Sequence, residues 1–129
     1  MAHPADVRYT AEHEWARAEG DLVTVGITSY ASEQLGDVVF VELPAVGRKL
    51  EAMKAFGVVE AVKTVSDLFA PVAGEVVAVN QALADNPALV NQSPYGEGWM
   101  IRVRPADAGA VAKLMTHEDY ERYLEEQHA

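Results

Sequence analysis

The chain has 129 residues, half of them hydrophobic, which is enough to bury the core of one ordinary domain. It contains no cysteine, so disulfides and cysteine metal sites are excluded. Ten Lys and Arg against twenty Asp and Glu give a net charge of −10, which repels nucleic-acid phosphates and favours a free monomer. No apolar run reaches the roughly 18 residues of a membrane span, and Met1–Asp6 does not resemble a signal or transit peptide. We therefore expect a cytoplasmic protein.

The first half of the chain predicts a hairpin, a helix and a strand. Alternating residues over 9–28 surround the turn signal Glu19-Gly20-Asp21 and predict a β-hairpin. Thr28 or Ser29 caps a helix of about two turns that stops at Gly36 in a left-handed conformation. A short apolar strand over 38–43 then ends at Pro44.

The second half predicts further strands and then a helix. Strands are expected over 56–62, 65–69, 74–79 and 99–103, with turns over 71–74 and 80–86. Residues 106–127 are expected to be helical, because Thr116-His-Glu-Asp119 resembles a capping box and Tyr120, Tyr123 and Leu124 have helical spacing. The fold class is thus mainly β, a sandwich or flattened barrel in a single domain over 1–129.

A weak internal repeat is also visible. Val46-Gly-Arg-Lys-Leu followed by Phe56-Gly-Val-Val resembles Asn86-Pro-Ala-Leu-Val followed by Gly98-Trp-Met-Ile. A duplicated four-strand unit would give a quasi-twofold sandwich with one hairpin at each end.

Lys63 is the most informative residue of the chain. It lies between two β-branched runs, in a short polar crest with Thr64 and Ser66, so we expect it near the tip of a hairpin over 56–69. A lysine that acts as a catalyst needs a buried site that lowers its pKa, whereas a lysine at a hairpin tip is accessible to a modifying enzyme. The other interpretation is an ordinary solvated turn lysine.

Other chemistry has less support in the sequence. Glu12 and Glu14 lie two residues apart, so on an extended strand they would share one face. Such a pair could be the acid and base of an enzyme, or it could be ordinary surface charge. The histidines are scattered without metal-ligand spacing and each is most simply a surface residue, so we assign no metal site. These histidines are His3, His13, His117 and His128.

Four blocks in order resemble the H proteins of the glycine cleavage system, over nearly the whole chain. They are Tyr9-Thr-Ala-Glu-His-Glu-Trp15, then Val25-Gly-Ile-Thr-Ser-Tyr-Ala31 with Leu35-Gly-Asp-Val-Val-Phe-Val-Glu-Leu-Pro44, then Phe56-Gly-Val-Val-Glu-Ala-Val-Lys-Thr-Val-Ser66, and Asn91-Gln-Ser-Pro-Tyr-Gly-Glu-Gly-Trp-Met-Ile101. The resemblance implies the lipoyl or biotinyl β-sandwich and lipoic acid in amide linkage to Lys63. Ala52-Met53-Lys54 resembles the core of biotinyl carriers, but only Lys63 has the family's spacing to the Pro71–Gly74 turn.

The resemblance also implies a function and partners. The lipoyl arm on Lys63 would accept an aminomethyl group from glycine decarboxylase and deliver it to an aminomethyltransferase for transfer to tetrahydrofolate. Dihydrolipoyl dehydrogenase would then reoxidise it, and a lipoyl transferase or ligase would attach it. The chain would be a carrier that catalyses no step itself. The alternative is an H-like relay or scaffold that supplies lipoyl groups to other complexes.

Two sets of residues are expected to support this carrier role. The loaded arm carries a protonated amine, so carboxylates are expected to hold it, namely Glu12, Glu14 and, with less support, Asp67. A solvated acidic strand end remains the other interpretation. Glu60, Thr64 and Ser66 are expected either to be read by the lipoyl-attaching enzyme or to serve the turn geometry.

Overall fold

The computed structural model describes residues 4–128, in which nine strands form two antiparallel sheets. In the large sheet the strand order is β1-β2-β3-β9-β8-β5. These strands are β1 Arg8–Tyr9, β2 Glu14–Glu19, β3 Leu22–Ile27, β9 Ile101–Pro105, β8 Gly74–Val79 and β5 Lys49–Leu50. The small sheet has the order β4-β6-β7, from β4 Val38–Glu42, β6 Ala55–Ala61 and β7 Val65–Phe69. The β-sandwich is confirmed, as two sheets rather than a closed barrel.

The core lies between the two sheets. Alternate residues of each strand point to opposite faces of a sheet, so one side-chain set per strand is buried. Val25, Val76 and Ile101 of the large sheet and Val59 and Leu68 of the small sheet are all at most 1% exposed. Fully burying each such side chain contributes about 1.5–3 kcal/mol, so this layer holds the sheets face to face.

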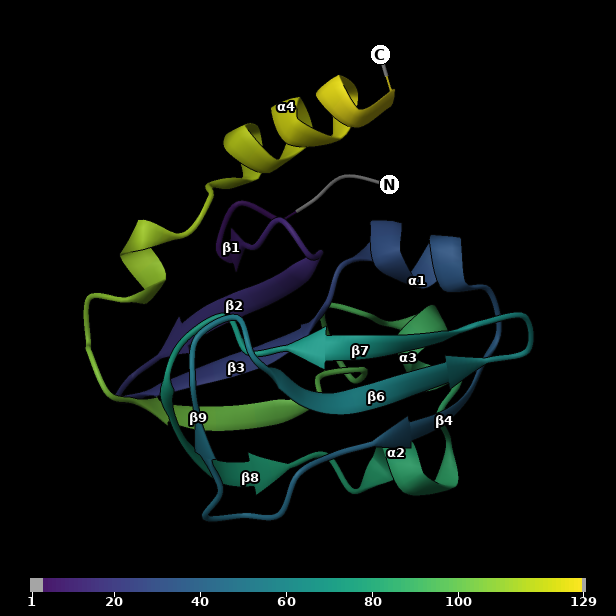
Figure 1. Ribbon diagram of the computed structural model, residues 1–129, viewed down its shortest axis with the longest axis horizontal. Coiled ribbons are helices and arrows are strands. Elements are labelled where there is room, and N and C mark those ends of the chain that lie inside the picture. The colour runs from purple at the N-terminus through teal and green to yellow at the C-terminus, as the bar shows by residue number, and fades with distance from the viewer. Residues whose placement is uncertain (1–3, 129) are drawn as a thin grey trace.

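The β6–β7 hairpin projects from one end of the sandwich (Figure 1). Its strands pair in the register Val59↔Ser66 and Glu60↔Val65. At this end it runs beside the connection from α1, Ser29–Leu35, to β4 (Figure 1). Thr28 caps α1, accepting a hydrogen bond from the Ala31 amide at 3.2 Å as the sequence indicated. Gly36 has φ 77° and ψ −154°, so φ is positive but the conformation is not the left-handed helical one that the sequence predicted.

Two short helices follow β8. The helix α2, Ala82–Asp85, lies where the sequence predicted a turn, and α3, Leu89–Gln92, lies beyond that turn, where the sequence predicted no element. Leu83 and Val90 are buried against the sandwich core. Tertiary burial of these apolar residues stabilises helices that are too short to form alone. The first block of the internal repeat does not keep the same secondary structure in both copies, because it aligns the strand β5 with the helix α3.

The C-terminal segment is less helical than expected. The helix α4 spans only His117–His128, and residues 106–116 form turns and the 3₁₀ helix η1, Val111–Lys113. The capping box is present, because the Thr116 hydroxyl accepts from the Asp119 amide and the Asp119 carboxylate accepts from the Thr116 amide. Its residues fix where α4 begins, while Asp107 and Gly109 form a separate turn upstream.

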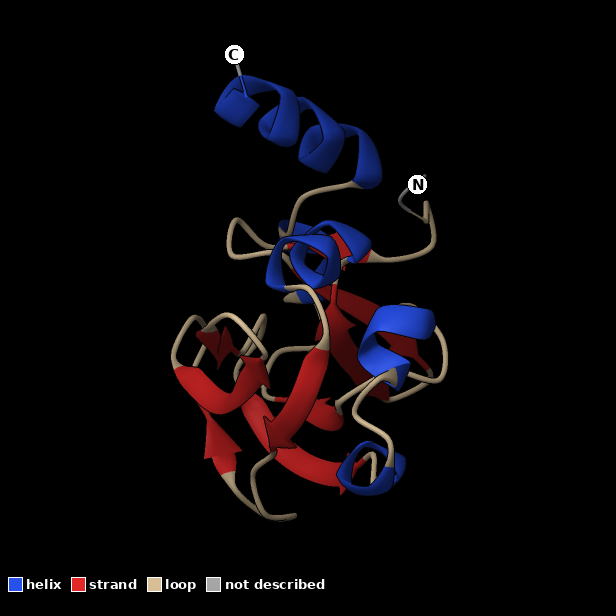
Figure 2. Ribbon diagram, turned by 90° about the vertical axis from the view of Figure 1, so that its right-hand side faces the viewer, coloured by secondary structure: helices blue, strands red, loops and turns tan. Residues whose placement is uncertain are grey.

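The α4 helix lies outside the sandwich, at one end of the molecule (Figure 2). It packs on the edge strand β1 of the large sheet. It inserts Tyr120, which is fully buried and stacks on Tyr9 with ring centroids 4.6 Å apart. Val7 and Trp15 complete this second core. None of the helices described within residues 4–128 is long and apolar enough to cross a membrane.

Candidate functional site

Lys63 lies at the exposed tip of the β6–β7 hairpin. The turn is closed by the Ala61 amide, which donates to the Thr64 carbonyl at 2.8 Å. The next residue, Val62, is 77% exposed, and its amide donates to the Asp37 carbonyl at 3.0 Å. Within the described part of the chain Lys63 forms no ion pair. The stem of this exposed lysine lies over Gly36 of the adjoining turn, with Cε 3.4 Å from the position that a Cβ on Gly36 would occupy.

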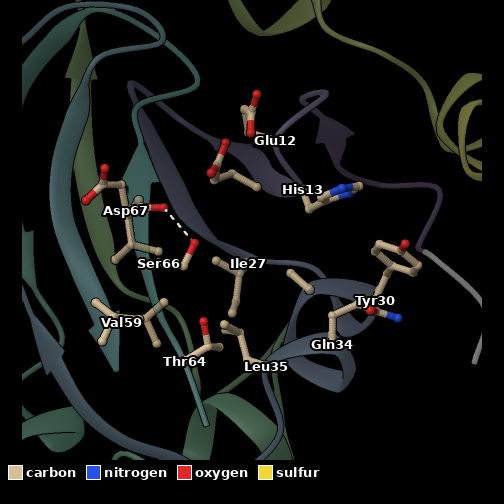
Figure 3. Close-up of a pocket in the computed structure, with 14 residues that line it drawn as sticks. Glu12, His13, Ile27, Tyr30, Gln34, Leu35, Val59, Thr64, Ser66 and Asp67 are labelled. Carbon is tan, nitrogen blue, oxygen red and sulfur yellow. Dashed lines mark hydrogen bonds between the residues drawn. The ribbon is translucent and has the colours of Figure 1, made fainter. Parts of the chain in front are cut away.

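A groove with a cavity volume of about 380 Å³ begins beside this tip. One wall is the free edge of β7, the opposite wall is α1, and residues 12–14 close one end (Figure 3). Four buried apolar side chains form much of the lining: Ile27, Leu35, Val59 and Leu68. The other lining residues are Glu12, His13, Glu14, Tyr30, Ala31, Gln34, Thr64, Val65, Ser66 and Asp67. The groove therefore combines buried apolar side chains with polar ones, and it has carboxylates at its closed end and on the β7 wall.

Glu14 is the buried acid of this groove, with 2% of its surface exposed. Its Oε1 accepts the Thr10 hydroxyl at 2.6 Å, and its Oε2 accepts the Phe69 amide from the free edge of β7 at 3.3 Å. Burial raises the pKa of the Glu14 carboxyl to about 8, although the bonds from Thr10 and Phe69 oppose the rise. The carboxyl therefore holds its proton to a higher pH than an exposed glutamate does.

Glu12 and Glu14 do not share the face of a strand. Glu12 is exposed in a turn, and β2 begins only at Glu14. Between them His13 has a φ of 71°, so the chain is not extended there. Both carboxylates still line the groove, because this turn rather than a strand brings them to it.

His13 is not a simple surface histidine, which corrects the expectation from its sequence context. It lines the groove, is half-buried, and its Nδ1 lies 2.8 Å from the Tyr120 hydroxyl on α4. Its ring also lies against Tyr30 of α1, with centroids 4.8 Å apart. Figure 3 shows both rings at the same end of the groove.

The β7 residues divide between the groove and the outer surface. Figure 3 shows the Ser66 hydroxyl pointing into the groove and the Asp67 carboxylate turned away from its centre. Thr64 lies beside Leu35 at the hairpin end (Figure 3). Glu60 does not line the groove and pairs across the small sheet with Phe40 and Val65, which are 49% and 60% exposed. The expected recognition residues therefore lie on two different faces of the hairpin.

The α1 wall was missed by reasoning from the sequence. Tyr30, Ala31, Gln34 and Leu35 all line the groove from this helix. Their spacing of one, three and four residues places them on one helical face, and that pattern could have been read. It does not reveal what the face covers, because α1 meets β7 only through the tertiary fold.

Lys54 lies elsewhere, in an exposed turn between β5 and β6. The Met53 amide donates to the Ala70 carbonyl and the Ala70 amide donates to the Lys54 carbonyl, so backbone bonds fix this turn. Lys54 is not part of the groove lining. Among residues 4–128 no three His, Asp or Glu side chains are grouped so that they could hold a metal ion.

Comparisons with known proteins identify the family. The family model described as Glycine cleavage H-protein matches residues 7–127. The glycine cleavage system H protein of Bacteroides thetaiotaomicron is 58% identical over 120 residues, covering 93% of this chain and 95% of that protein. The corresponding protein of Thermus thermophilus is 58% identical over 125 residues, covering 97% and 98%.

A solved structure agrees with these sequence relatives. The crystal structure of a glycine cleavage system H protein from Mycobacterium marinum superposes with a TM-score of 0.84 at 46% identity, covering 98% of this chain and all of that one. The family match spans the hairpin, the groove and α4 together. This chain therefore belongs to the glycine cleavage H-protein family, the non-catalytic lipoyl-carrying shuttle subunits of the glycine cleavage system.

Proposed function

We propose that Lys63 carries lipoic acid in amide linkage and that the groove beside it shelters the loaded arm. One observation carries this proposal: an exposed lysine at a hairpin tip adjoins a groove that combines buried apolar side chains with carboxylates at its closed end. A lysine-linked arm is apolar in its chain and polar at its far end, so the residues present fit it. When bound, the group supplies a disulfide that accepts and releases a one-carbon unit.

The apolar lining would exclude water from the arm. Ile27, Leu35 and Val59 are buried side chains whose surfaces contribute to the groove. Contact with them would favour a docked arm by roughly 25 cal/mol per Å² of apolar surface covered. An arm tethered at Lys63 needs no separate encounter with the groove, because the tether keeps the local concentration high.

The acidic end would hold the protonated amine of the aminomethyl cargo. Glu14 faces this end while still protonated, so an arriving ammonium group would favour loss of that proton and a charge-assisted hydrogen bond. Glu12 is exposed at the same end and adds negative charge with less desolvation. Asp67 is the third candidate, and its carboxylate would have to turn toward the groove to take part.

The proposed partners are the other enzymes of the glycine cleavage system. Glycine decarboxylase would load the arm, the aminomethyltransferase would unload it to tetrahydrofolate, and dihydrolipoyl dehydrogenase would restore the disulfide. A lipoyl transferase or ligase would read the hairpin through Glu60, Thr64 and Ser66. The relay role in other complexes would present the same lysine, and family membership favours the shuttle.

The test is mass spectrometry of protein treated with lipoate and a lipoate–protein ligase that modifies a known carrier. One lipoyl group is expected on the Lys63 peptide, none in Lys63→Arg, and unchanged modification in Lys54→Arg. Modification that survives in Lys63→Arg would contradict the assignment. Glycine-dependent loading of the lipoylated protein by glycine decarboxylase then separates the shuttle from the relay.

A further inference from the structure

The turn between α1 and β4 supports the hairpin tip. The Asp37 carbonyl in this turn accepts the Val62 amide at 3.0 Å. Cε of Lys63 lies 3.4 Å from the position that a Cβ on Gly36 would occupy, so the stem of Lys63 lies over the same turn. The hairpin tip extends beyond its own strand pairing, and Asp37 holds it from outside the hairpin.

The side chain of Asn91, from α3, holds the α1–β4 turn in place. Its Nδ2 donates to the Gly36 carbonyl at 2.8 Å and to the Ser32 hydroxyl at 3.2 Å. Its Oδ1 accepts the Val38 amide at 2.9 Å. The side chain thus bonds to the residues on both sides of Asp37.

We propose that Asn91 is a positioning residue for the modification of Lys63. Through Gly36 and Val38 it fixes Asp37, and Asp37 fixes Val62 next to the lysine. A tip that is already ordered need not be ordered by the modifying enzyme, so less binding free energy is lost when the two proteins meet. The proposal rests on the proposed function, because it takes Lys63 as the residue that is modified.

Asn80 offers a matched control within the same chain. It is buried, its Nδ2 donates to the Glu97 and Trp99 carbonyls at 2.8 Å each, and its Oδ1 accepts the Ala82 amide at 3.2 Å. Asn80 therefore matches Asn91 in making two donor bonds and one acceptor bond, although one donor bond of Asn91 goes to the Ser32 hydroxyl rather than to a backbone carbonyl. They join β8, α2 and the segment before β9, so the side chain does not bond to the α1–β4 turn or to the hairpin.

The experiment compares Asn91→Asp with Asn80→Asp, since each change keeps the side-chain shape and removes both N–H donors. The first measurement is amide hydrogen exchange at Val62 in the unlipoylated protein. We expect exchange about tenfold faster in Asn91→Asp than in the wild type or Asn80→Asp, because the bond to Asp37 opens more often. Equal exchange in the two variants would overturn the proposal.

The second measurement is lipoylation by a lipoate–protein ligase under steady-state conditions. We expect KM for Asn91→Asp to rise about fivefold with kcat within about twofold of the wild type, and both constants to be unaffected in Asn80→Asp. An unchanged KM would overturn the proposal even if exchange at Val62 is faster. Asn91→Ala removes the same two donor contacts and also the bond from the Val38 amide, without adding charge. It replaces Asn91→Asp, with Asn80→Ala as its control, if Asn91→Asp does not fold.

The two proposals fail in different ways. If the wild type is not lipoylated while a known carrier is, the proposed function fails. The exchange measurement on the unmodified chain does not depend on that outcome and still tests whether Asn91 holds the hairpin tip.

Discussion

The Tyr120 hydroxyl on α4 lies 2.8 Å from Nδ1 of His13, a residue of the groove lining. The same hydroxyl lies 2.8 Å from the hydroxyl of Thr28, the residue that caps α1. A buried atom of the C-terminal helix thus contacts both the closed end of the groove and the start of its α1 wall. Burial raises the pKa of Tyr120, so the hydroxyl retains its proton at physiological pH.

Tyr120→Phe is expected to lower the free energy of unfolding by about 1–3 kcal/mol, because it removes a buried hydroxyl with two partners. Denaturant titration measures this loss. Tyr123→Phe is the control, since its hydroxyl also has two partners, donating to the Ala11 carbonyl at 3.2 Å and accepting from Gln127 Nε2 at 2.9 Å. Both bonds are exposed to solvent, so their loss is expected to cost about 1 kcal/mol or less. Equal losses in the two variants would show that burial of the Tyr120 hydroxyl adds nothing to its contribution to the free energy of unfolding.

Glu14 is expected to make stability fall as pH rises. Its pKa is about 8 in the folded chain against a reference value of 4.5, so between these values the folded state holds a proton that the unfolded state has lost. The contribution is complete below the reference value and is lost as pH rises through about 8, at no more than about 1.4 kcal/mol per pH unit.

Glu14→Gln should remove this dependence. Thermal or denaturant unfolding would be measured for the wild type and the variant across this pH range. The difference between their free energies of unfolding is expected to grow toward alkaline pH. Glu12→Gln, at an exposed position, should follow the wild type. Parallel profiles for wild type and Glu14→Gln would contradict the buried, protonated state.

The same substitution tests the holding of the cargo. Lipoylated Glu14→Gln, loaded with the aminomethyl group, should lose it about tenfold faster than the wild type, because one charge-assisted hydrogen bond contributes about 1.5–3 kcal/mol. The measurement is release of the one-carbon unit over time in the absence of the aminomethyltransferase. Glu12→Gln should change this lifetime less, and an unchanged lifetime in Glu14→Gln would remove that residue from the proposed holding site.

Gly36→Ala is expected to destabilise the chain by about 1–3 kcal/mol. A φ of 77° with a ψ of −154° is a region that is almost restricted to glycine, so an alanine there is strained. Denaturant unfolding measures the cost, and amide exchange at Val62 reports whether the strain reaches the hairpin. Gly109→Ala is the control, because its Cβ would meet only Asp107 Oδ1, at 3.5 Å, and φ is not positive there. A near-neutral Gly36→Ala would mean that the turn adjusts without cost.

The sequence determined the elements whose signals are local. Period-two alternation and a turn predict the β6–β7 hairpin and place Lys63 near its tip, and Thr28 predicts the start of α1. The residue types also carry the family resemblance, because its four blocks can be read along the chain without knowing the fold. Each of these signals depends on neighbours within a few positions.

Only the tertiary structure decided the chemistry of the groove. The burial that raises the pKa of Glu14 and the bond that it accepts from Phe69 come from segments far apart in the chain. The same holds for the contact of His13 with Tyr120 and for the bonds of Asn91 to the α1–β4 turn. A residue's desolvation and its distant partners depend on how the sheets and helices pack, and no local pattern encodes that packing.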